Sequence, residues 1–338
     1  MSAVDASVLV PVLNEEAFIR DTVAAMQAQD FDGEVEFLFM DGGSEDRTRE
    51  LVEELAREDP RIRLFDNPGR TSTAGLNVGL RHARGEYVVR MDAHTFYPPD
   101  YIARGIERLR RGDVVWVAGP VIPEGRGKWS RRVALALGSW LGTGGSARLS
   151  SSGPEDEREL DTGVFAGMAR REVVEAHGGW DEEWRVNQDS ELAARILADG
   201  GRIVSIPALA SRYVPRDDLE SLAKQYWRYG TYRAKTASRH PNSLEARQLF
   251  PLALVGALAG SVVLPRALRG VARLGVGAYG AALGLNSARV AREAGAADGA
   301  GVAAVLAVMH LAWGFGFVNG SIRFGPPVEA FARMARGD

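Results

Sequence analysis

The chain has 338 residues, enough for one large domain or two of ordinary size, and its 46% hydrophobic and 25% charged residues exclude a disordered protein. The formal net charge of -3 gives no reason to expect nucleic acid as a partner, and the absence of cysteine excludes disulfides and thiolate metal sites. Residues 1–7 carry Asp5 and no basic residue, which is unlike a signal peptide. We therefore expect the N-terminal part of the chain to stay in the cytoplasm.

Short apolar runs alternate with amphipathic stretches over roughly the first two hundred residues, which is the pattern of a mainly parallel α/β sheet. Two of the expected strands lead into aspartates, Asp41 and Asp92, and ligands of such sheets bind outside the carboxyl ends of the strands. A plain turn residue is the favoured interpretation of Asp41 taken alone. The pattern predicts strands at residues 7–12, 35–40, 62–65, 87–91 and 114–118, a helix at 16–29, a second helix capped by Ser44, and a mobile loop or disordered insertion at 143–159.

Three apolar stretches follow a change of composition near Phe250. A full membrane span takes about 20 apolar residues, and these stretches are shorter or interrupted by glycine, which favours close helix packing in lipid. We interpret them as membrane-associated helices and keep a buried soluble hairpin as the alternative. Arg266, Arg269 and Arg273 crowd the first connection, so the first stretch breaks the positive-inside rule, is re-entrant or lies in the interface. The stretches are residues 250–264, 274–287 and 302–318.

An acidic residue and an imidazole stand two positions apart after the strand expected at 87–91, as Asp92-Ala93-His94. On a turn at the end of a strand both side chains can face one divalent ion. A carboxylate suits Mg²⁺ or Mn²⁺, and an imidazole shifts the preference toward Mn²⁺. An ion held there would neutralise a pyrophosphate, which is one interpretation of the motif. The alternative is that it has no function, because most D-x-H sequences taken alone have none.

Asp189 lies near the start of an amphipathic helix that continues through Leu192 and Ile196. The helix dipole stabilises a carboxylate at this position as the anion. Such a carboxylate suits a general base that removes a proton from a hydroxyl group. Helix capping, by Asp189 or by Asn187, is the structural alternative.

A third group of polar and aromatic residues stands at residues 225–229. Gln225 and Arg228 are three positions apart and share one face of a helix, where the arginine can grip a phosphate with two parallel hydrogen bonds. The same aromatic and arginine side chains can also anchor the helix at a membrane surface, and both interpretations can hold together.

These residues belong to an ordered set of short motifs that covers roughly residues 7–230. The set consists of V-P-V-L-N-E at 10–15, D-G-G-S-E-D-R-T at 41–48, N-P-G-R at 67–70, A-G-L-N-V-G at 74–79, A-R-G-E-Y at 83–87, D-A-H at 92–94, Q-D at 188–189 and Q-Y-W-R-Y at 225–229. This order resembles family 2 glycosyltransferases. R-M-D-A-H at 90–94, Y-V-P-R at 213–216 and H-L-A-W-G-F-G at 310–316 resemble the membrane-associated, ExoA-like transferases of bacterial exopolysaccharide (succinoglycan-type) assembly.

The resemblance implies a GT-A fold, which is a Rossmann-like α/β domain, followed by a C-terminal helical membrane-associated region. It also implies a nucleotide-sugar donor, with a UDP-sugar expected, a divalent metal, Mn²⁺ or Mg²⁺, and inversion at the anomeric carbon. Carried over by position, the base and ribose of the donor would be bound by Pro11, Glu15 and Asp41, with Arg70 and Asn77 lining the same pocket.

The same carry-over gives roles to the remaining motifs. Asp92 and His94 would bring the metal to the diphosphate of the donor, and Asp189 would be the catalytic base. Residues placed near the diphosphate and the acceptor are Gln225, Arg228, Tyr229 and Trp184, the last of which, like Trp180, would stack on the acceptor sugar or pack the core.

Three positions depart from the family pattern. His94 replaces the second aspartate of the metal motif, Gln188 replaces the first acid of an acidic pair, and Tyr229 replaces a tryptophan. These changes bear on the identity of the metal, on the number of carboxylates and on stacking against the acceptor. The presumed base is unaffected.

The expected function is transfer of a sugar to a lipid-linked saccharide or polysaccharide acceptor at the cell membrane, with the catalytic domain in the cytoplasm. A polyprenyl-phosphate sugar synthase and a non-catalytic membrane scaffold that binds nucleotide sugar are the alternatives. A nicotinamide dehydrogenase is excluded because no G-x-G-x-x-G follows the first strand. The expected organisation is a catalytic domain at 1–215, interface helices at 216–248, membrane-associated helices at 249–325 and a tail at 326–338.

Overall fold

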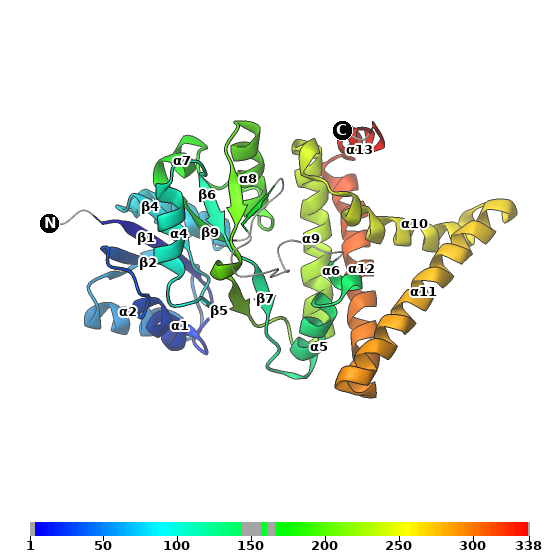
Figure 1. The fold of residues 1–338 in the computed structure, drawn as a ribbon, viewed down its shortest axis with the longest axis horizontal. Coiled ribbons are helices and arrows are strands. Elements are labelled where there is room, and N and C mark those ends of the chain that lie inside the picture. The colour runs from blue at the N-terminus through cyan, green and yellow to red at the C-terminus, as the bar shows by residue number, and fades with distance from the viewer. Residues whose placement is uncertain (1–3, 144–156, 161–165, 337–338) are drawn as a thin grey trace. The chain divides into compact units, whose positions relative to one another are not determined.

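The computed structural model describes residues 4–143, 157–160 and 166–336, and the chain folds into two compact units (Figure 1). Residues 1–122 and 150–213 belong to the first unit, and residues 123–149 and 214–338 belong to the second. Most of the loop expected at 143–159 lies outside the described residues. The predicted fold class, an α/β domain followed by a helical region, is confirmed.

An eight-stranded mixed sheet forms the centre of the first unit. Its strands, in spatial order, are β3 (Ile62–Asp66), β2 (Val35–Asp41), β1 (Ala6–Val12), β4 (Tyr87–Arg90), β9 (Gly167–Arg170), β6 (Trp116–Ala118), β10 (Ile203–Ser205) and β8 (Arg158–Glu159). The first four are parallel to one another, and β9 runs antiparallel to both of its neighbours. A small second sheet consists of β5 (Thr95–Phe96), β11 (Ser211–Tyr213) and β7 (Val121–Pro123).

Helices cover both faces of the large sheet. On one face, α1 (Ile19–Gln27), α2 (Thr48–Glu58) and α4 (Tyr101–Arg110) pack in one buried core with alternate residues of β1, among them Val8 and Val10. On the opposite face, α3 (Ser72–His82) approaches β1 and β2 closely, because Gly79 leaves room for Leu9 and Met40. After β9 come α7 (Arg171–Ala176), α8 (Gln188–Ala198) and a 3-10 turn at Pro207–Leu209.

The five strands expected from the sequence form with ends within two residues of the expected ones. The prediction that Ser44 caps a helix is wrong. α2 begins after Arg47 without a side-chain cap, and the Ser44 hydroxyl donates to Asp41 and accepts the Asn14 amide instead. Ser44 has these partners because the loops after β1 and β2 lie side by side.

Glu36 is buried at the start of β2 and joins four segments of the first unit. Its carboxylate accepts hydrogen bonds from the Ser7 hydroxyl at 2.7 Å, from Arg63 at 2.9 Å, and from the Arg84 amide at 2.7 Å and side chain at 2.9 Å. Burial disfavours the charged carboxylate, but the bonds from Ser7, Arg84 and Arg63 outweigh burial and lower the pKa of Glu36.

We expect Glu36→Gln to lower the free energy of unfolding by about 1–3 kcal/mol at neutral pH, because two arginines lose their charged partner. The lowered pKa means that the stabilisation by Glu36 is present above its ordinary value of 4.5 and is lost as the pH falls through the folded-state value. The difference between the native protein and the variant should therefore shrink in acid. Chemical unfolding followed by circular dichroism at several pH values measures it. Glu53→Gln, on the exposed side of α2, is the control, and an equal effect of both changes would contradict the prediction.

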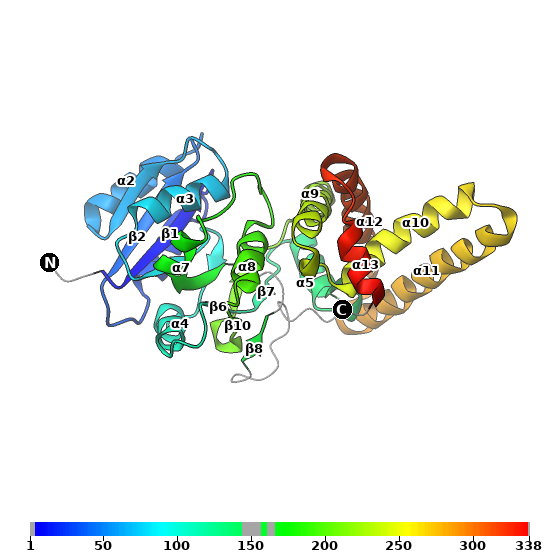
Figure 2. The same ribbon diagram turned by 90° about the horizontal axis from the view of Figure 1, so that it is seen from above.

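The second unit is helical. Its helices are α5 (Lys128–Leu137), α6 (Trp140–Thr143), α9 (Leu219–Arg239), 3-10 turns at Pro241–Ser243 and Ala246–Gln248, α10 (Leu249–Val263), α11 (Arg266–Ala294), α12 (Ala296–Phe324) and α13 (Val328–Arg336). The long helices α9 and α12 lie side by side in both views (Figures 1 and 2). Their backbones approach closely because a Cβ at Gly316 or Gly320 would overlap the carbonyl oxygen of Trp227 or Thr231.

The motif at residues 310–316 is explained by packing within this unit. The His310 ring lies between the Tyr279 hydroxyl at 3.0 Å and the Leu141 carbonyl at 3.1 Å, and it thereby links α11 and α6 to α12. Since a carbonyl only accepts, Nε2 carries the proton and Nδ1 accepts from the tyrosine. Gly314 lies against the carbonyl of Pro251 in α10.

α10 and α11 form an open hairpin that extends away from α9 and α12 (Figures 1 and 2). Only three residues of α10 and one residue of α11 are buried, so within the described residues this hairpin is not the buried soluble one considered above. Among the residues that the structure describes, two helical segments, Ala246–Val263 and Ala296–Phe324, are long and apolar enough to cross a membrane. The expected tail at 326–338 is mostly the amphipathic helix α13.

Candidate active site

The loops after β1 and β4 meet at the carboxyl edge of the sheet. These neighbouring strands mark the point where the winding of the sheet reverses, since β2 and β3 lie on one side of β1 and β4 lies on the other. Glu15 follows β1 and His94 follows β4, and His94 Nδ1 lies 3.0 Å from Glu15 Oε1. The structure thus brings together one residue assigned to the donor and one assigned to the metal.

Asp41 ends β2, and its buried carboxylate organises the turn after the strand. Oδ1 accepts hydrogen bonds from the Ser44 amide at 3.1 Å and hydroxyl at 2.6 Å, and Oδ2 lies 3.4 Å from Arg49. In this structure Asp41 therefore acts as the turn residue considered in the sequence. Its role toward a nucleotide stays a prediction.

The loops after β1, β2 and β3 form one rim. The Thr48 hydroxyl accepts the Glu15 amide at 2.6 Å, and Pro11 stands near the end of β1 beside Met40. Arg70, which has a positive φ of 53°, carries its exposed guanidinium to within 3.4 Å of the Gly43 carbonyl. Residues assigned to the base and ribose from separate motifs thus line a common edge.

Asn77 and Trp184 have partners inside the first unit. The Asn77 amide group donates to the Trp180 carbonyl at 2.7 Å and accepts the Trp180 amide at 2.9 Å, so it fixes the segment that leads to α8. Trp184 is only 1% exposed, and its carbonyl accepts the Thr73 hydroxyl. In this structure the Trp184 side chain packs in the core, and stacking on a sugar would require its ring to become exposed.

Arg90, the last residue of β4, contacts both of the aspartates to which chemistry was assigned. Nε lies 2.9 Å from Asp92 Oδ1 and Nη2 lies 3.1 Å from Asp92 Oδ2, which is a bidentate pair. Nη1 lies 2.5 Å from Asp189 Oδ2, and the Trp180 indole N–H donates to Asp189 Oδ1 at 3.0 Å. One buried guanidinium therefore joins the metal motif to the presumed base.

The charges of this cluster reinforce one another. Burial disfavours the charged guanidinium, but the charges of Asp189 and Asp92 outweigh burial and raise the pKa of Arg90. Burial likewise disfavours the Asp92 carboxylate, yet the positive charge of Arg90, with smaller contributions from His94 and from the Arg90 hydrogen bonds, lowers its pKa. Arg90 and Asp92 therefore stay ionised at neutral pH.

The start of α8 separates the two interpretations of Asp189. Asn187 stands at the N-cap in the left-handed region, with φ 62°, and its side chain makes no capping hydrogen bond. The oxygens of Asp189 face Arg90 and Trp180 instead of the first turn of the helix. Neither residue is a side-chain cap, so capping does not account for Asp189. Gln188, which replaces an acid, is buried beside it.

The residues at the metal motif fit a cation that takes most of its ligands from elsewhere. Arg90 occupies one lone pair on each oxygen of Asp92, which leaves one on each oxygen, and His94 is half exposed on the same turn. Within the described residues no group of three or more His, Asp or Glu side chains is arranged to hold an ion. One or two carboxylates completed by substrate phosphates and water are the usual arrangement for Mg²⁺, and an imidazole beside the carboxylate shifts the preference toward Mn²⁺.

Gln225, Arg228 and Tyr229 lie on α9 in the second unit. Tyr229 contacts Tyr226 edge to face, and Trp227 between them is 42% exposed. Arg228 is exposed, so its side chain is available at the surface of this unit. The roles of these three residues toward diphosphate and acceptor stay predictions.

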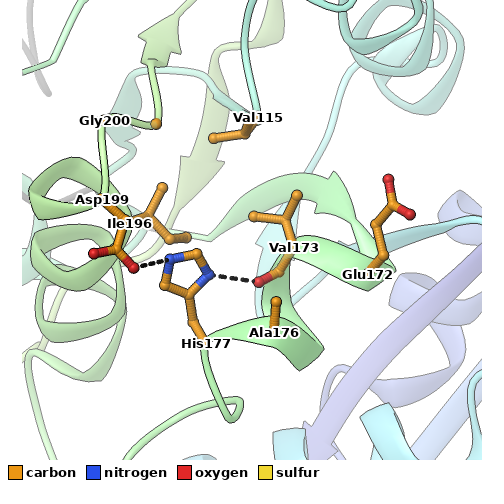
Figure 3. Close-up of a pocket in the computed structure, with 9 residues that line it drawn as sticks. Val115, Glu172, Val173, Ala176, His177, Ile196, Asp199 and Gly200 are labelled. Atoms are coloured by element: carbon orange, nitrogen blue, oxygen red, sulfur yellow. Dashed lines mark hydrogen bonds and ion pairs between the residues drawn. The ribbon is translucent and has the colours of Figure 1, made fainter.

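A hollow of about 500 Å³ lies elsewhere on the first unit, at the C-terminal ends of α7 and α8 (Figure 3). Val115, Val173 and Ile196 form part of its wall. His177 donates from Nδ1 to the Val173 carbonyl at 2.7 Å and turns Nε2 toward Asp199 at 3.3 Å (Figure 3). Asp189 lies at the opposite end of α8, so this hollow is not part of the candidate active site.

Sequence reasoning missed Arg90 as a functional residue. It appeared only as one letter of R-M-D-A-H, and nothing in the local pattern shows which carboxylates its side chain reaches. Asp189 is 99 positions away along the chain. The composition of β4 did contain one signal, because an arginine in an otherwise apolar strand needs a buried partner.

Comparison with known proteins concerns the family and the fold of the chain. The model of Glycosyl transferase family 2 matches residues 7–173. The succinoglycan biosynthesis protein ExoA of Rhizobium meliloti is 35% identical over 330 residues, which cover 94% of this chain and 95% of that protein. A dolichyl N-acetyl-alpha-D-glucosaminyl phosphate 3-beta-D-2,3-diacetamido-2,3-dideoxy-beta-D-glucuronosyltransferase of Methanococcus voltae is 25% identical over 232 residues, 66% of this chain and 71% of that one.

A solved structure shares the fold. The mannosyltransferase PcManGT from Pyrobaculum calidifontis, in complex with GDP-Man and Mn²⁺, matches with a TM-score of 0.56 and 21% identity. The match covers 98% of this chain and 87% of that chain. At this identity the likeness concerns the fold, which is that of a GT-A domain with further helices.

Proposed function

The chain belongs to glycosyl transferase family 2 and is a glycosyltransferase. We propose that it moves a sugar, with inversion, from a nucleotide-sugar donor to a lipid-linked saccharide or polysaccharide at a membrane surface. One observation carries the proposal. Two buried carboxylates, Asp92 and Asp189, meet on Arg90 at the carboxyl edge of the sheet, where donors of this fold class bind. The names of the two relatives, one in succinoglycan biosynthesis and one acting on a dolichyl-linked sugar phosphate, support the choice of acceptor.

The proposed reaction is a single in-line displacement. Asp189 accepts the proton of the acceptor hydroxyl as that oxygen attacks the anomeric carbon of the donor. The new glycosidic bond forms while the bond from the anomeric carbon to the diphosphate breaks. The nucleoside diphosphate leaves with the electron pair of that bond, and one displacement inverts the configuration.

Asp92 and His94 would hold a divalent cation, which supplies positive charge where the departing diphosphate becomes negative. Arg228, on α9 of the second unit, would bind phosphate, because a guanidinium pairs with phosphate oxygens through two hydrogen bonds. Glu15, Asp41 and Arg70 on the shared rim would bind base and ribose. The turn at 92–94 and the rim are adjacent through the contact of His94 with Glu15.

A membrane covers the hairpin of the second unit in this proposal. Apolar side chains on α10 and α11 are largely exposed, among them Val263, Val271, Leu274 and Leu285. Apolar surface of this extent needs a partner, and a bilayer suits it because the segment of α10 and the neighbouring helix α12 are each long and apolar enough to cross one. An acceptor with a lipid carrier would then reach the enzyme from the same bilayer.

The test is a panel of UDP- and GDP-sugars offered to the membrane-embedded protein with Mn²⁺ and with lipid-linked saccharide acceptors. We expect release of nucleoside diphosphate with one donor class and only when an acceptor is present. Binding of a nucleotide sugar without any turnover across the panel would support a non-catalytic scaffold instead.

We expect His94→Ala to raise the Mn²⁺ concentration required for half-maximal transfer by about tenfold or more, because Asp92 would remain as the only ligand of the motif. Titration of transfer activity with Mn²⁺ measures the effect. His82→Ala is the control, since His82 stacks on Phe65 at the far end of α3. An unchanged Mn²⁺ requirement in His94→Ala would remove His94 from the metal site.

A further inference from the structure

The guanidinium of Arg90 is divided between two carboxylates in a way that only arginine can provide. Nε and Nη2 form the fork that holds both oxygens of Asp92, and Nη1 is left to reach Asp189 at 2.5 Å. A lysine has a single nitrogen on a flexible stem and cannot form the fork and the third contact with fixed geometry. All three side chains are at least nine-tenths buried, so water does not compete for these hydrogen bonds.

Asp189 is fixed through both of its oxygens. Arg90 takes one lone pair of Oδ2, and the Trp180 indole N–H takes one lone pair of Oδ1 at 3.0 Å. The Ala166 amide lies farther from Oδ2, at 3.5 Å. A carboxylate offers about four acceptor positions, so a lone pair on Oδ1 stays available for a hydroxyl proton. The two bonds orient the group and leave it able to accept that proton.

From this geometry we infer that Arg90 is a positioning residue, which sets the orientation of the base Asp189 and couples that orientation to Asp92 on the donor side. The inference rests on the proposed function, because it takes Asp189 as the base. A shift of the Asp92 carboxylate moves the fork and, with it, the nitrogen that holds Asp189. Arg90 itself touches neither reactant in this scheme.

The experiment compares Arg90→Lys with the native enzyme in kcat, in donor KM and in the dissociation constant of the released nucleoside diphosphate. We expect kcat to fall by about 10- to 100-fold, because a misplaced base loses that much rate. Donor KM and nucleotide affinity should stay within about twofold. In combination with Asp189→Asn, Arg90→Lys should cause no further loss, since a residue that acts through Asp189 has nothing left to orient.

Arg108→Lys is the matched control. Arg108 is also a buried arginine of the first unit that bridges two acids, Asp113 and Glu157, with contacts of 2.5–2.9 Å. It lies at the end of α4 and has no assigned role in the reaction. We expect Arg108→Lys to lower thermal stability about as much as Arg90→Lys does, with kcat unchanged.

Trp180→Phe provides a second variant if Arg90→Lys does not fold. It removes the other hydrogen bond to Asp189, so kcat should fall while nucleotide affinity is kept. A native kcat in both Arg90→Lys and Trp180→Phe would overturn the inference about Arg90. So would a loss of kcat in Arg90→Lys that Arg108→Lys matches. Either outcome would leave the proposed function standing. Native turnover in Asp189→Asn would overturn the proposed mechanism as well.

Discussion

Asp189→Asn is expected to reduce transfer by about 10²- to 10⁴-fold while leaving nucleotide affinity nearly unchanged. An amide has the shape of the carboxylate but cannot take the proton of the acceptor hydroxyl. Residue 189 is held by Arg90 and Trp180, and neither of these is among the residues proposed to bind the base, the ribose or the phosphates. Release of nucleoside diphosphate measures transfer, and calorimetric titration with the same nucleotide measures binding.

Asp199→Asn is the control for this experiment. It makes the same chemical change on the same helix, at the exposed C-terminal end of α8 near His177. Turnover close to native in Asp189→Asn would show that the base assignment is wrong. It would favour the polyprenyl-phosphate sugar synthase, because a lipid phosphate is already ionised and needs no base.

Gly316→Ala in α12 is expected to destabilise the second unit by about 1–3 kcal/mol, the usual cost of overpacking a closely packed interface. A Cβ at residue 316 would overlap the Trp227 carbonyl oxygen, so α9 and α12 would have to separate. Transfer should fall too, since α9 carries Gln225 and Arg228. Thermal unfolding in detergent and nucleoside diphosphate release measure the two effects.

Gly284→Ala separates packing from helix propensity. Gly284 lies in α11, and a Cβ there would meet nothing within 4 Å. Alanine favours a helix over glycine by about 0.5–1 kcal/mol, so this variant should be neutral or slightly more stable. Equal loss of stability in Gly316→Ala and Gly284→Ala would mean that the close approach of α9 and α12 does not contribute to the stability of the second unit.

The local sequence was a good guide wherever a pattern repeats within one element. The parallel strands β1 to β4 could be predicted because each is an apolar run bounded by polar turns. β9 could not, because its four residues include glycine and arginine and it pairs in the opposite direction. Its position depends on neighbours that are distant along the chain.

In the candidate site, too, some features follow from the local sequence and others depend on residues that are distant along the chain. Asp92 and Asp189 could be singled out because ordered motifs surround them and one follows a strand while the other opens a helix. Trp184 is near Asp189 in sequence, yet its ring is buried, which depends on α3 and not on local pattern. Ser44 has the residue type of a cap, but its partners come from the turn after β2 and the loop after β1.

The family, the α/β class of the first unit and the charged residues at the ends of its strands follow from the sequence alone, because motif order and apolar periodicity are local properties. That Arg90 holds Asp92 and Asp189 together depends on the fold. Arg90 and Asp189 are 99 positions apart, and they meet because β9 pairs with β4 and α8 then begins beside the end of that strand. The physical reason is burial: a guanidinium removed from water must pair with carboxylates, and only the folded chain supplies two of them within reach.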